Sequence, residues 1–231
     1  MDKQGNLYTV LYAVVMVVVV AAVLALVATG LKEKQDKNVE VAKKIDLLKS
    51  VGIASDATTA VKLYDNHIGE NTKVINMNGE EIKGEAFAID LAKELRKEPK
   101  DRNYPLYICN LDNGEEKLII PLRGVGLWGA IWGYISIDSD KNTVYGATFD
   151  HKGETPGLGA EISKDFFETQ FKGKTIFDNS GAFTSIAVLK GGVSEGNPHA
   201  VDAISGGTIT SNGVTDMLKE CLEGYEKYLK N

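Results

Sequence analysis

Residues 104–122 read YPLYICNLDNGEEKLIIPL, and this stretch indicates the fold. Two apolar runs, 104–111 and 117–122, flank Asp112-Asn113-Gly114, a sequence typical of tight turns. Short apolar runs on both sides of such a turn predict two antiparallel strands. A second pair of runs, 129–137 and 143–149, flanks residues 138–142 and predicts that the hairpin continues as an antiparallel meander.

Helices are predicted mainly on either side of this meander. Short helices are indicated at 56–66, 85–97 and 163–171, with Ser163 as the N-cap of the last, and a longer one at 211–229. A hairpin at 73–83, with its turn at Asn78-Gly79, and a strand at 184–190 complete the pattern. Helices clustered at the two ends with strands between them predict an α+β fold, with a largely antiparallel sheet flanked by helices.

The N-terminal segment has the composition of a membrane span. Residues 10–28 form an unbroken apolar run, and no charged residue lies between Lys3 and Lys32. About 20 apolar residues cross the hydrocarbon of a bilayer as a helix. A cleaved signal peptide is the alternative, but its apolar core usually has about 7–15 residues. We therefore predict a transmembrane anchor at 1–31, a juxtamembrane helical stalk at 32–55 and a soluble domain at 56–231.

Charge and rare residues argue against other kinds of site. The net charge is −6 and the charges are mixed, whereas a nucleic-acid-binding face needs clustered Lys and Arg. His67, His151 and His199 are widely separated, so the sequence predicts no metal cluster. Cys109 and Cys221 are the only cysteines. They could form one bridge, although lone thiols in apolar surroundings are more often core residues.

A glycine-rich segment before the final helix has the chemistry of a phosphate site. Residues 202–211 read DAISGGTITS. Gly206 and Gly207 let the backbone approach a bulky ligand, and the helix N-terminus beyond them offers N–H groups and a favourable dipole. Ser205, Thr208, Thr210 and Ser211 add hydroxyl donors. A plain turn with a Ser or Thr helix cap would use the same residues, and composition alone favours that alternative.

Three further segments place glycines beside polar or aromatic residues. Residues 153–159, GETPGLG, form a rigid, tight loop with a carboxylate at Glu154, a hydroxyl at Thr155 and an exposed Leu158. In residues 124–129, GVGLWG, the glycines permit Trp128 to pack against a flat ligand. Lys190 ends a strand before two glycines. The alternatives are an ordinary turn for the loop, a core position for Trp128 and a solvated side chain for Lys190.

Taken together, these segments resemble the C subunit of the sodium-translocating NADH:quinone oxidoreductase. One N-terminal span is followed, in the same order and spacing, by GLW at 126–128, GETPGLG at 153–159, KGG at 190–192 and SGGTITSNGV at 205–214. The resemblance covers nearly the full length. The same flavin-binding domain occurs in the G subunit of the related Rnf electron-transport complex, but the extended match at 126–128 and 211–214 favours the first family.

The resemblance implies a flavoprotein with covalently bound FMN. In that family FMN is attached by a phosphoester to the last threonine of the pattern Asp-x-x-Ser/Thr-Gly-Ala-Thr, which here is Thr208. Gly207 stands where the family usually has Ala, and the smaller residue should keep access for the modifying enzyme. That enzyme is a separate flavin transferase, which uses FAD.

We expect the remaining candidate residues to hold the two ends of the flavin. The helix start after Thr208 would stabilise the phosphate charge. Thr155 and Leu158 would hold the isoalloxazine, with Trp128 packed nearby, and Lys190 would favour the reduced anionic ring. The full set of candidate cofactor-binding residues is Thr208, Ser205, Gly206, Gly207, Thr210, Thr155, Leu158, Trp128 and Lys190.

The resemblance also implies partners and placement. The protein would relay electrons within the complex, coupled to Na⁺ export, while NADH oxidation and quinone reduction involve the other subunits. Its FMN-binding domain, 56–231, would lie on the periplasmic side of the bacterial inner membrane. Two alternatives remain open. The G subunit of an Rnf-type ion-translocating ferredoxin:NAD oxidoreductase would keep the flavin, whereas a membrane-anchored non-redox binding protein would use the glycine loops only as turns.

Overall fold

The computed structural model describes residues 5–194 and 196–231, and the chain falls into two compact units. The first runs to Lys43, and the second runs from Lys44 to Asn231. One helix, α1 (Asn6–Ser50), continues from the first unit into the second. In the second unit, its residues Leu47 and Leu48 are fully buried.

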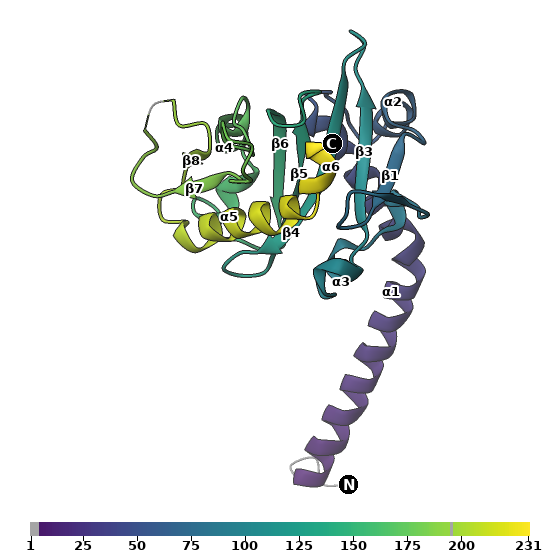
Figure 1. Cartoon of the computed structure of the whole chain (residues 1–231). Helices are drawn as coiled ribbons and strands as arrows, with labels where there is room; N and C mark the ends of the chain where they lie inside the picture. The colour runs from purple at the N-terminus through teal and green to yellow at the C-terminus, as the bar shows by residue number, and fades with distance from the viewer. Residues whose placement is uncertain (1–4, 195) are drawn as a thin grey trace. The chain divides into compact units, whose positions relative to one another are not determined.

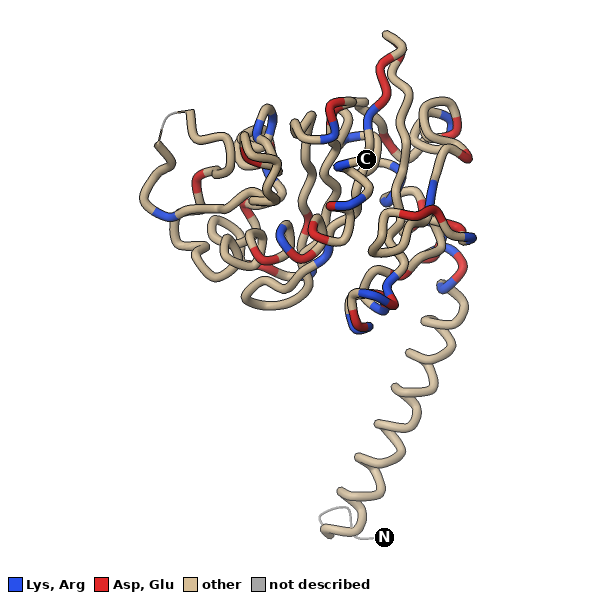
Figure 2. Tube along the Cα trace, in the orientation of Figure 1, with Lys and Arg blue, Asp and Glu red and all other residues tan. Residues whose placement is uncertain are grey.

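The N-terminal part of α1 has the surface of a membrane helix. Every residue from Val10 to Leu31 is exposed, and Figure 2 shows no charged residue along this part of the helix. Such a surface is unfavourable in water and suits lipid, where a helix satisfies its own backbone hydrogen bonds. The predicted long apolar N-terminal helix is confirmed. Among the described residues, α1 is the one helix with the length and composition to cross a membrane.

The second unit is built on a six-stranded antiparallel sheet in the order β2-β1-β3-β4-β5-β6 (Figure 1). The strands are β1 (Thr72–Ile75), β2 (Glu81–Ile82), β3 (Tyr104–Asn110), β4 (Glu116–Val125), β5 (Ala130–Ile137) and β6 (Val144–His151). From β3 to β6 each strand pairs with the next one along the chain. The predicted meander and the predicted hairpin at 73–83 are both confirmed.

Both faces of this sheet are buried, which explains why its strands read as apolar runs rather than as an alternation. Successive side chains of a strand point to opposite faces. Ile120 of β4 belongs to the core cluster that includes residues of α5 (Thr208–Glu223). Its neighbour Ile119 is buried on the opposite face, where it pairs with Ser136 of β5. Ser136 bonds to Ser50, so the end of α1 covers that second face.

Three helix predictions need correction. The helix expected at 85–97 is interrupted, because Ile89 and Asp90 are extended and Asp90 caps the short helix α3 (Leu91–Glu94) by accepting the N–H of Ala92. Ser163 does not cap α4 (Asp165–Glu168). Its hydroxyl donates to the carbonyl of Ala160 instead.

The final helix also differs from the prediction. It begins at Thr208 rather than at 211, and it breaks before α6 (Glu226–Lys230). The remaining helical elements are α2 (Ala60–His67) and 3-10 turns at 86–88, 99–101, 159–163 and 169–171. The earlier start matters for the site, because it places Thr208 in the first turn of α5.

A second, smaller sheet leads into the start of α5. Its strands β7 (Ala187–Leu189) and β8 (Ala200–Asp202) are parallel. β7 lies inside the strand predicted at 184–190, but β8 was not predicted. A parallel partner is reached through a long connection, so no local turn signals it. β8 ends where the segment 203–207 begins, and it therefore fixes the position of that segment.

The two cysteines are free and buried. Cys109 lies on β3 and Cys221 on α5. Burial raises the pKa of the Cys109 thiol to about 11 and that of Cys221 to about 12. Neither thiol is therefore ionised at neutral pH. The sequence left open whether the two cysteines form a bridge or lie in the core, and the structure places both in the core as free thiols.

Candidate functional site

Three segments that are far apart in the sequence meet beside the start of α5. They are the β4–β5 turn at 126–129, the loop after β6 at 152–158, and the glycine-rich segment at 203–207. They surround a pocket of about 210 Å³. The pocket is lined by Leu127, Glu154, Thr155, Leu158, Gly159, Gly206, Gly207, Thr208, Ile209 and Thr210.

The carboxylate of Glu154 joins the first two of these segments to the first turn of α5. Its Oε1 accepts the backbone N–H of Trp128 at 2.7 Å, and its Oε2 accepts the hydroxyl of Thr210 at 2.5 Å. Glu154 is only 4% exposed and Thr210 only 2%. The backbone N–H of Glu154 donates to Nδ1 of His151 at 3.1 Å. We call this arrangement of Glu154, Thr210 and the Trp128 N–H the glutamate clasp.

Two glycines leave the space that this carboxylate occupies. A Cβ added to Gly126 would stand 2.7 Å from Oε1 of Glu154. A Cβ added to Gly159 would stand 2.5 Å from Oε2 and would overlap the hydroxyl of Thr210. Both distances are shorter than van der Waals contact allows, so glycine is required at both positions for packing. The glycines of two separate sequence motifs thus serve the same side chain.

Glu154 is held in its ionised form. Burial by itself would raise its pKa, but the hydrogen bonds from the Thr210 hydroxyl and from the backbone of Trp128 and Leu127 outweigh burial. The pKa of Glu154 therefore lies below its ordinary value, with a smaller contribution from His151. The wall of the pocket accordingly carries a fixed negative charge at neutral pH.

The N-terminal end of α5, where the first backbone N–H groups of the helix lie, has no side-chain cap from the described residues. Its N-cap is Gly207, and within the described part of the chain no side chain bonds to the first turn as a cap. The alternative considered from the sequence, a Ser or Thr side chain that caps this helix, is therefore not found. Gly206 leads into the helix with a φ of +75°, which residues with a Cβ rarely adopt. Thr208 is half-buried and lines the pocket. An uncapped helix start favours an anionic group.

The pocket brings together most of the residues predicted for the cofactor. The predicted residues that line it are Thr208, Gly206, Gly207, Thr210, Thr155 and Leu158. The hydroxyl of Thr210, however, is bonded to Glu154 rather than presented to a ligand. Thr208 therefore differs from Thr210 in its exposure, although both lie in the first turn of α5.

Three predicted residues do not line the pocket. Ser205 is exposed beside it. The side chain of Trp128 is 68% exposed, which excludes the core alternative, and its backbone N–H is the part bonded to Glu154. Lys190 is exposed after β7, as the solvated alternative expected.

Sequence reasoning missed four residues of the pocket wall. They are Glu154, Leu127, Gly159 and Ile209. Leu127 is 49% exposed and Ile209 is 57% exposed, although both are apolar. A signal was available for these two, because each is a large apolar residue inside a glycine-rich segment. Glu154 was visible only as one carboxylate in a turn, where such residues are usually solvated.

The pocket offers surfaces for two kinds of chemical group. The uncapped helix start and the half-buried hydroxyl of Thr208 suit an anion such as phosphate. The side chains of Leu127, Leu158 and Ile209 offer apolar contacts to a flat ring. This set of groups fits a phosphate-bearing aromatic cofactor, and FMN has this chemistry.

Comparison with known proteins agrees with this chemistry. Residues 126–223 match the model of the FMN-binding domain family. The chain is 32% identical over 208 residues to the C subunit of the Na⁺-translocating NADH-quinone reductase of Vibrio vulnificus strain YJ016, with 83% of this chain and 81% of that protein covered. It is 28% identical to the protein of the same name from Pseudomonas aeruginosa, with 100% and 97% covered. The crystal structure of the corresponding protein from Parabacteroides distasonis gives a TM-score of 0.80 at 47% identity, with 87% and 98% covered.

Proposed function

The chain belongs to the family of C subunits of the Na⁺-translocating NADH-quinone reductase, and from this premise we propose that it carries FMN covalently on Thr208 and relays electrons within such a complex. Bound FMN supplies the redox chemistry, and the chain supplies position and electrostatics. No general acid, base or nucleophile is required of the chain for electron transfer.

The observation that carries the proposal is the difference among the hydroxyls at the start of α5. Thr210 is 2% exposed and donates to Glu154. Ser211 is 1% exposed, and its Oγ accepts the N–H of Ile204 at 3.2 Å. Thr208 is half-buried and lines the pocket. Thr208 is thus the hydroxyl of this turn that a modifying enzyme can reach.

Attachment at Thr208 requires a flavin transferase and FAD. Oγ1 of Thr208 forms a bond to the phosphorus of the FMN half, the pyrophosphate P–O bond breaks, AMP leaves, and the hydroxyl proton is lost to solvent. The product phosphodiester keeps a negative charge beside the uncapped start of α5, which stabilises that charge. A Cβ added to Gly206 would stand 2.6 Å from the side chain of Leu158, and one added to Gly207 would stand 3.1 Å from that of Ile204, so packing favours glycine at both positions.

The walls of the pocket would orient the ring. Leu127, Leu158 and Ile209 supply apolar contacts, and Thr155 supplies a hydroxyl. Trp128 is exposed next to Leu127 and can cover the ring from outside the pocket. Among the nine predicted residues, Ser205 and Lys190 have the weakest support, because both are exposed and neither lines the pocket.

The partners follow from the proposed role. The electron donor and acceptor are other subunits of the reductase, whose activity is coupled to Na⁺ export. We infer that α1 anchors the chain in the bacterial inner membrane as a single span. Of the stalk predicted at 32–55, the part from Lys44 onward belongs to the compact FMN-binding domain, and we infer that this domain lies on the periplasmic side. A membrane anchor raises the effective concentration of the domain near its partners, and a covalent bond keeps FMN from being lost outside the cytoplasm.

The test is direct detection of the bond. The full-length chain is co-expressed with its flavin transferase, purified, denatured and examined for in-gel fluorescence and intact mass. We expect a fluorescent band whose mass exceeds that of the polypeptide by one FMN less one water. Thr208→Ala should lose both signals. Thr210→Ser, which keeps the hydroxyl that bonds to Glu154, should retain both.

The proposal fails if the wild-type band is colourless while the same transferase modifies another substrate. It also fails if Thr208→Ala keeps the added mass, because the bond would then lie elsewhere.

A further inference from the structure

We propose that Glu154 is a positioning residue of the FMN pocket and that its fixed negative charge lowers the reduction potential of FMN bound there. The inference rests on the proposed function, since it concerns the same pocket. It assigns a role to a residue that the sequence did not single out.

The positioning role follows from what the carboxylate joins. Glu154 lies in the loop after β6, its Oε1 accepts from the β4–β5 turn, and its Oε2 accepts from the first turn of α5. Each of these three parts of the chain contributes residues to the lining of the pocket. The bond between Thr210 and Glu154 joins residues 56 positions apart, so no local structure replaces it. Without the carboxylate, the walls that bear Leu127 and Thr208 lose their shared attachment.

The charge of Glu154 is balanced mainly by neutral donors. Its hydrogen bonds come from a hydroxyl and from backbone N–H groups. Among the ion pairs between described residues, none includes Glu154. The negative charge is therefore not neutralised by an ion-pair partner among these residues, and it lies in the wall of the pocket.

A charge in this position opposes reduction of a ring held in the pocket. Reduction adds negative charge to the ring, and like charges a few ångströms apart repel strongly where water is partly excluded. Lys190, which the sequence suggested for the opposite effect, is exposed and does not line the pocket. Screening by water weakens the field of such a lysine more than that of the buried carboxylate. The nearer, buried group should therefore dominate.

The experiment separates charge from shape with two near-isosteric variants. Glu154→Gln keeps the side-chain shape and an oxygen that accepts from Trp128, but it removes the charge. Thr210→Val removes one hydrogen bond and keeps the charge. Each full-length, flavin-loaded protein is titrated by spectroelectrochemistry in detergent, and the visible circular dichroism of the flavin reports its orientation.

We expect Glu154→Gln to shift the midpoint potential to more positive values, while Thr210→Val does not. We expect Glu154→Ala to lose most of the flavin dichroism, because both attachments are lost. An unchanged potential in Glu154→Gln, or an equal positive shift in Thr210→Val, would overturn the inference. If Glu154→Gln does not fold, the midpoint potential of Thr210→Val still tests the inference. A potential above that of the wild type would contradict a role for the retained charge. A potential no higher than that of the wild type would support it.

Failure of this inference is distinct from failure of the proposed function. Wild-type protein without bound flavin would refute the attachment at Thr208. Wild-type protein that carries flavin on Thr208, with Glu154→Gln identical to it in potential, would refute only the role of Glu154.

Discussion

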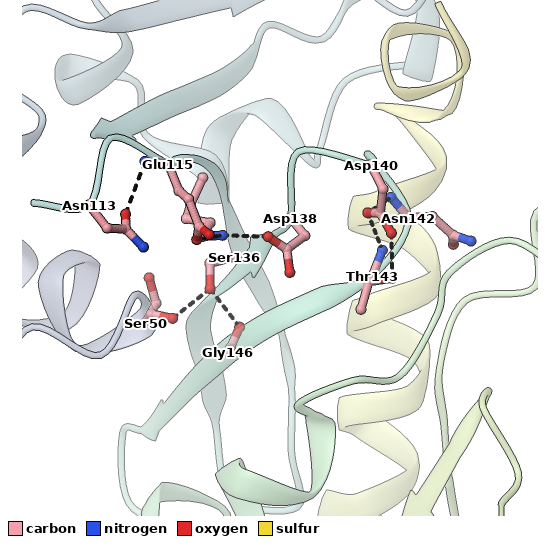
Figure 3. A network of polar contacts seen from close by, with 10 residues as sticks. Ser50, Asn113, Glu115, Ser136, Asp138, Asp140, Asn142, Thr143 and Gly146 are labelled. Carbon is pink, nitrogen blue, oxygen red and sulfur yellow. Dashed lines mark hydrogen bonds and ion pairs between the residues drawn. The ribbon is translucent and has the colours of Figure 1, made fainter. Parts of the chain in front are cut away.

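The hydroxyl of Ser136 donates to the main-chain carbonyl of Ser50 at 2.5 Å, and this bond joins the C-terminal end of β5 to the end of α1 (Figure 3). Both residues are buried. The carbonyl of Gly146 on β6 lies 3.0 Å from the same hydroxyl. Gly146 also has to be a glycine, because a Cβ there would overlap the carbonyl of Ser50. The last turn of α1 is thus an integral part of the domain.

Removal of this hydroxyl should destabilise the domain. Ser136→Ala leaves the buried carbonyl of Ser50 without its side-chain donor, which costs about 1–3 kcal/mol of unfolding free energy. Urea unfolding of the full chain in detergent, followed by tryptophan fluorescence, measures this loss. Ser139→Ala is the matched control, since Ser139 is exposed in the turn after β5. Equal midpoints for the two variants would show that the bond to Ser50 contributes nothing.

Gly159→Ala should break the glutamate clasp from within. The new methyl group would overlap the Thr210 hydroxyl and crowd Oε2 of Glu154, so either the side chains or the loop must move. We expect a loss of about 1–3 kcal/mol in unfolding free energy and a much lower yield of flavin-loaded protein. Gly153→Ala is the control from the same loop, because a Cβ there meets none of the described residues within 4 Å. Comparable flavin loading of the two variants would contradict the packing argument.

Thr210→Val should weaken the acid dependence of stability. The folded-state pKa of Glu154 is lowered below its ordinary value of 4.5, so its ionised form stabilises the fold above that pH. This contribution is lost as the pH falls through the lowered pKa. Valine removes the hydroxyl donor, which brings the pKa back up and reduces the contribution. We expect the difference in unfolding free energy between pH 7 and pH 3 to be smaller in the variant. An identical pH profile would count against the clasp, and Thr215→Val on the same helix is the control.

Asp46→Asn should stabilise the protein at high pH and not at low pH. Burial, and then Asp150 and Glu168, raise the pKa of Asp46 to about 6, although Lys49 opposes this. The folded state therefore binds this proton more tightly than the unfolded state does. Proton binding stabilises the fold at low pH, and this contribution is lost as the pH rises through about 6 and the carboxyl ionises. Because Asp46 is only partly buried, we expect a gain of about 1 kcal/mol at pH 8.

At pH 4 the same substitution should change the unfolding free energy little, because the wild-type carboxyl is then largely protonated in the fold. Asp101→Asn, at an exposed position, is the control at both pH values. A gain that is equal at pH 4 and pH 8 would refute the assignment of the raised pKa to Asp46.

Local signals explain why much of the fold could be predicted. The turn at 112–114 and the runs on either side of it specify a hairpin through residues that are neighbours in sequence, and the apolar run at 10–28 specifies a helix by its length alone. The interrupted helix at 85–97 shows the limit. Asp90 is extended, so it separates the 3-10 turn at 86–88 from α3, which it caps. The composition of the segment does not predict this break.

The sequence by itself determined the apolar helix, the antiparallel meander and the glycine-rich motif that contains Thr208, because each depends on residues close together along the chain. Only the tertiary structure decided which hydroxyl of that motif is buried and which is reachable. That distinction comes from Glu154, which binds Thr210 from a loop 56 residues away. Contacts over such a distance depend on how the sheet places its loops, and no local pattern encodes them.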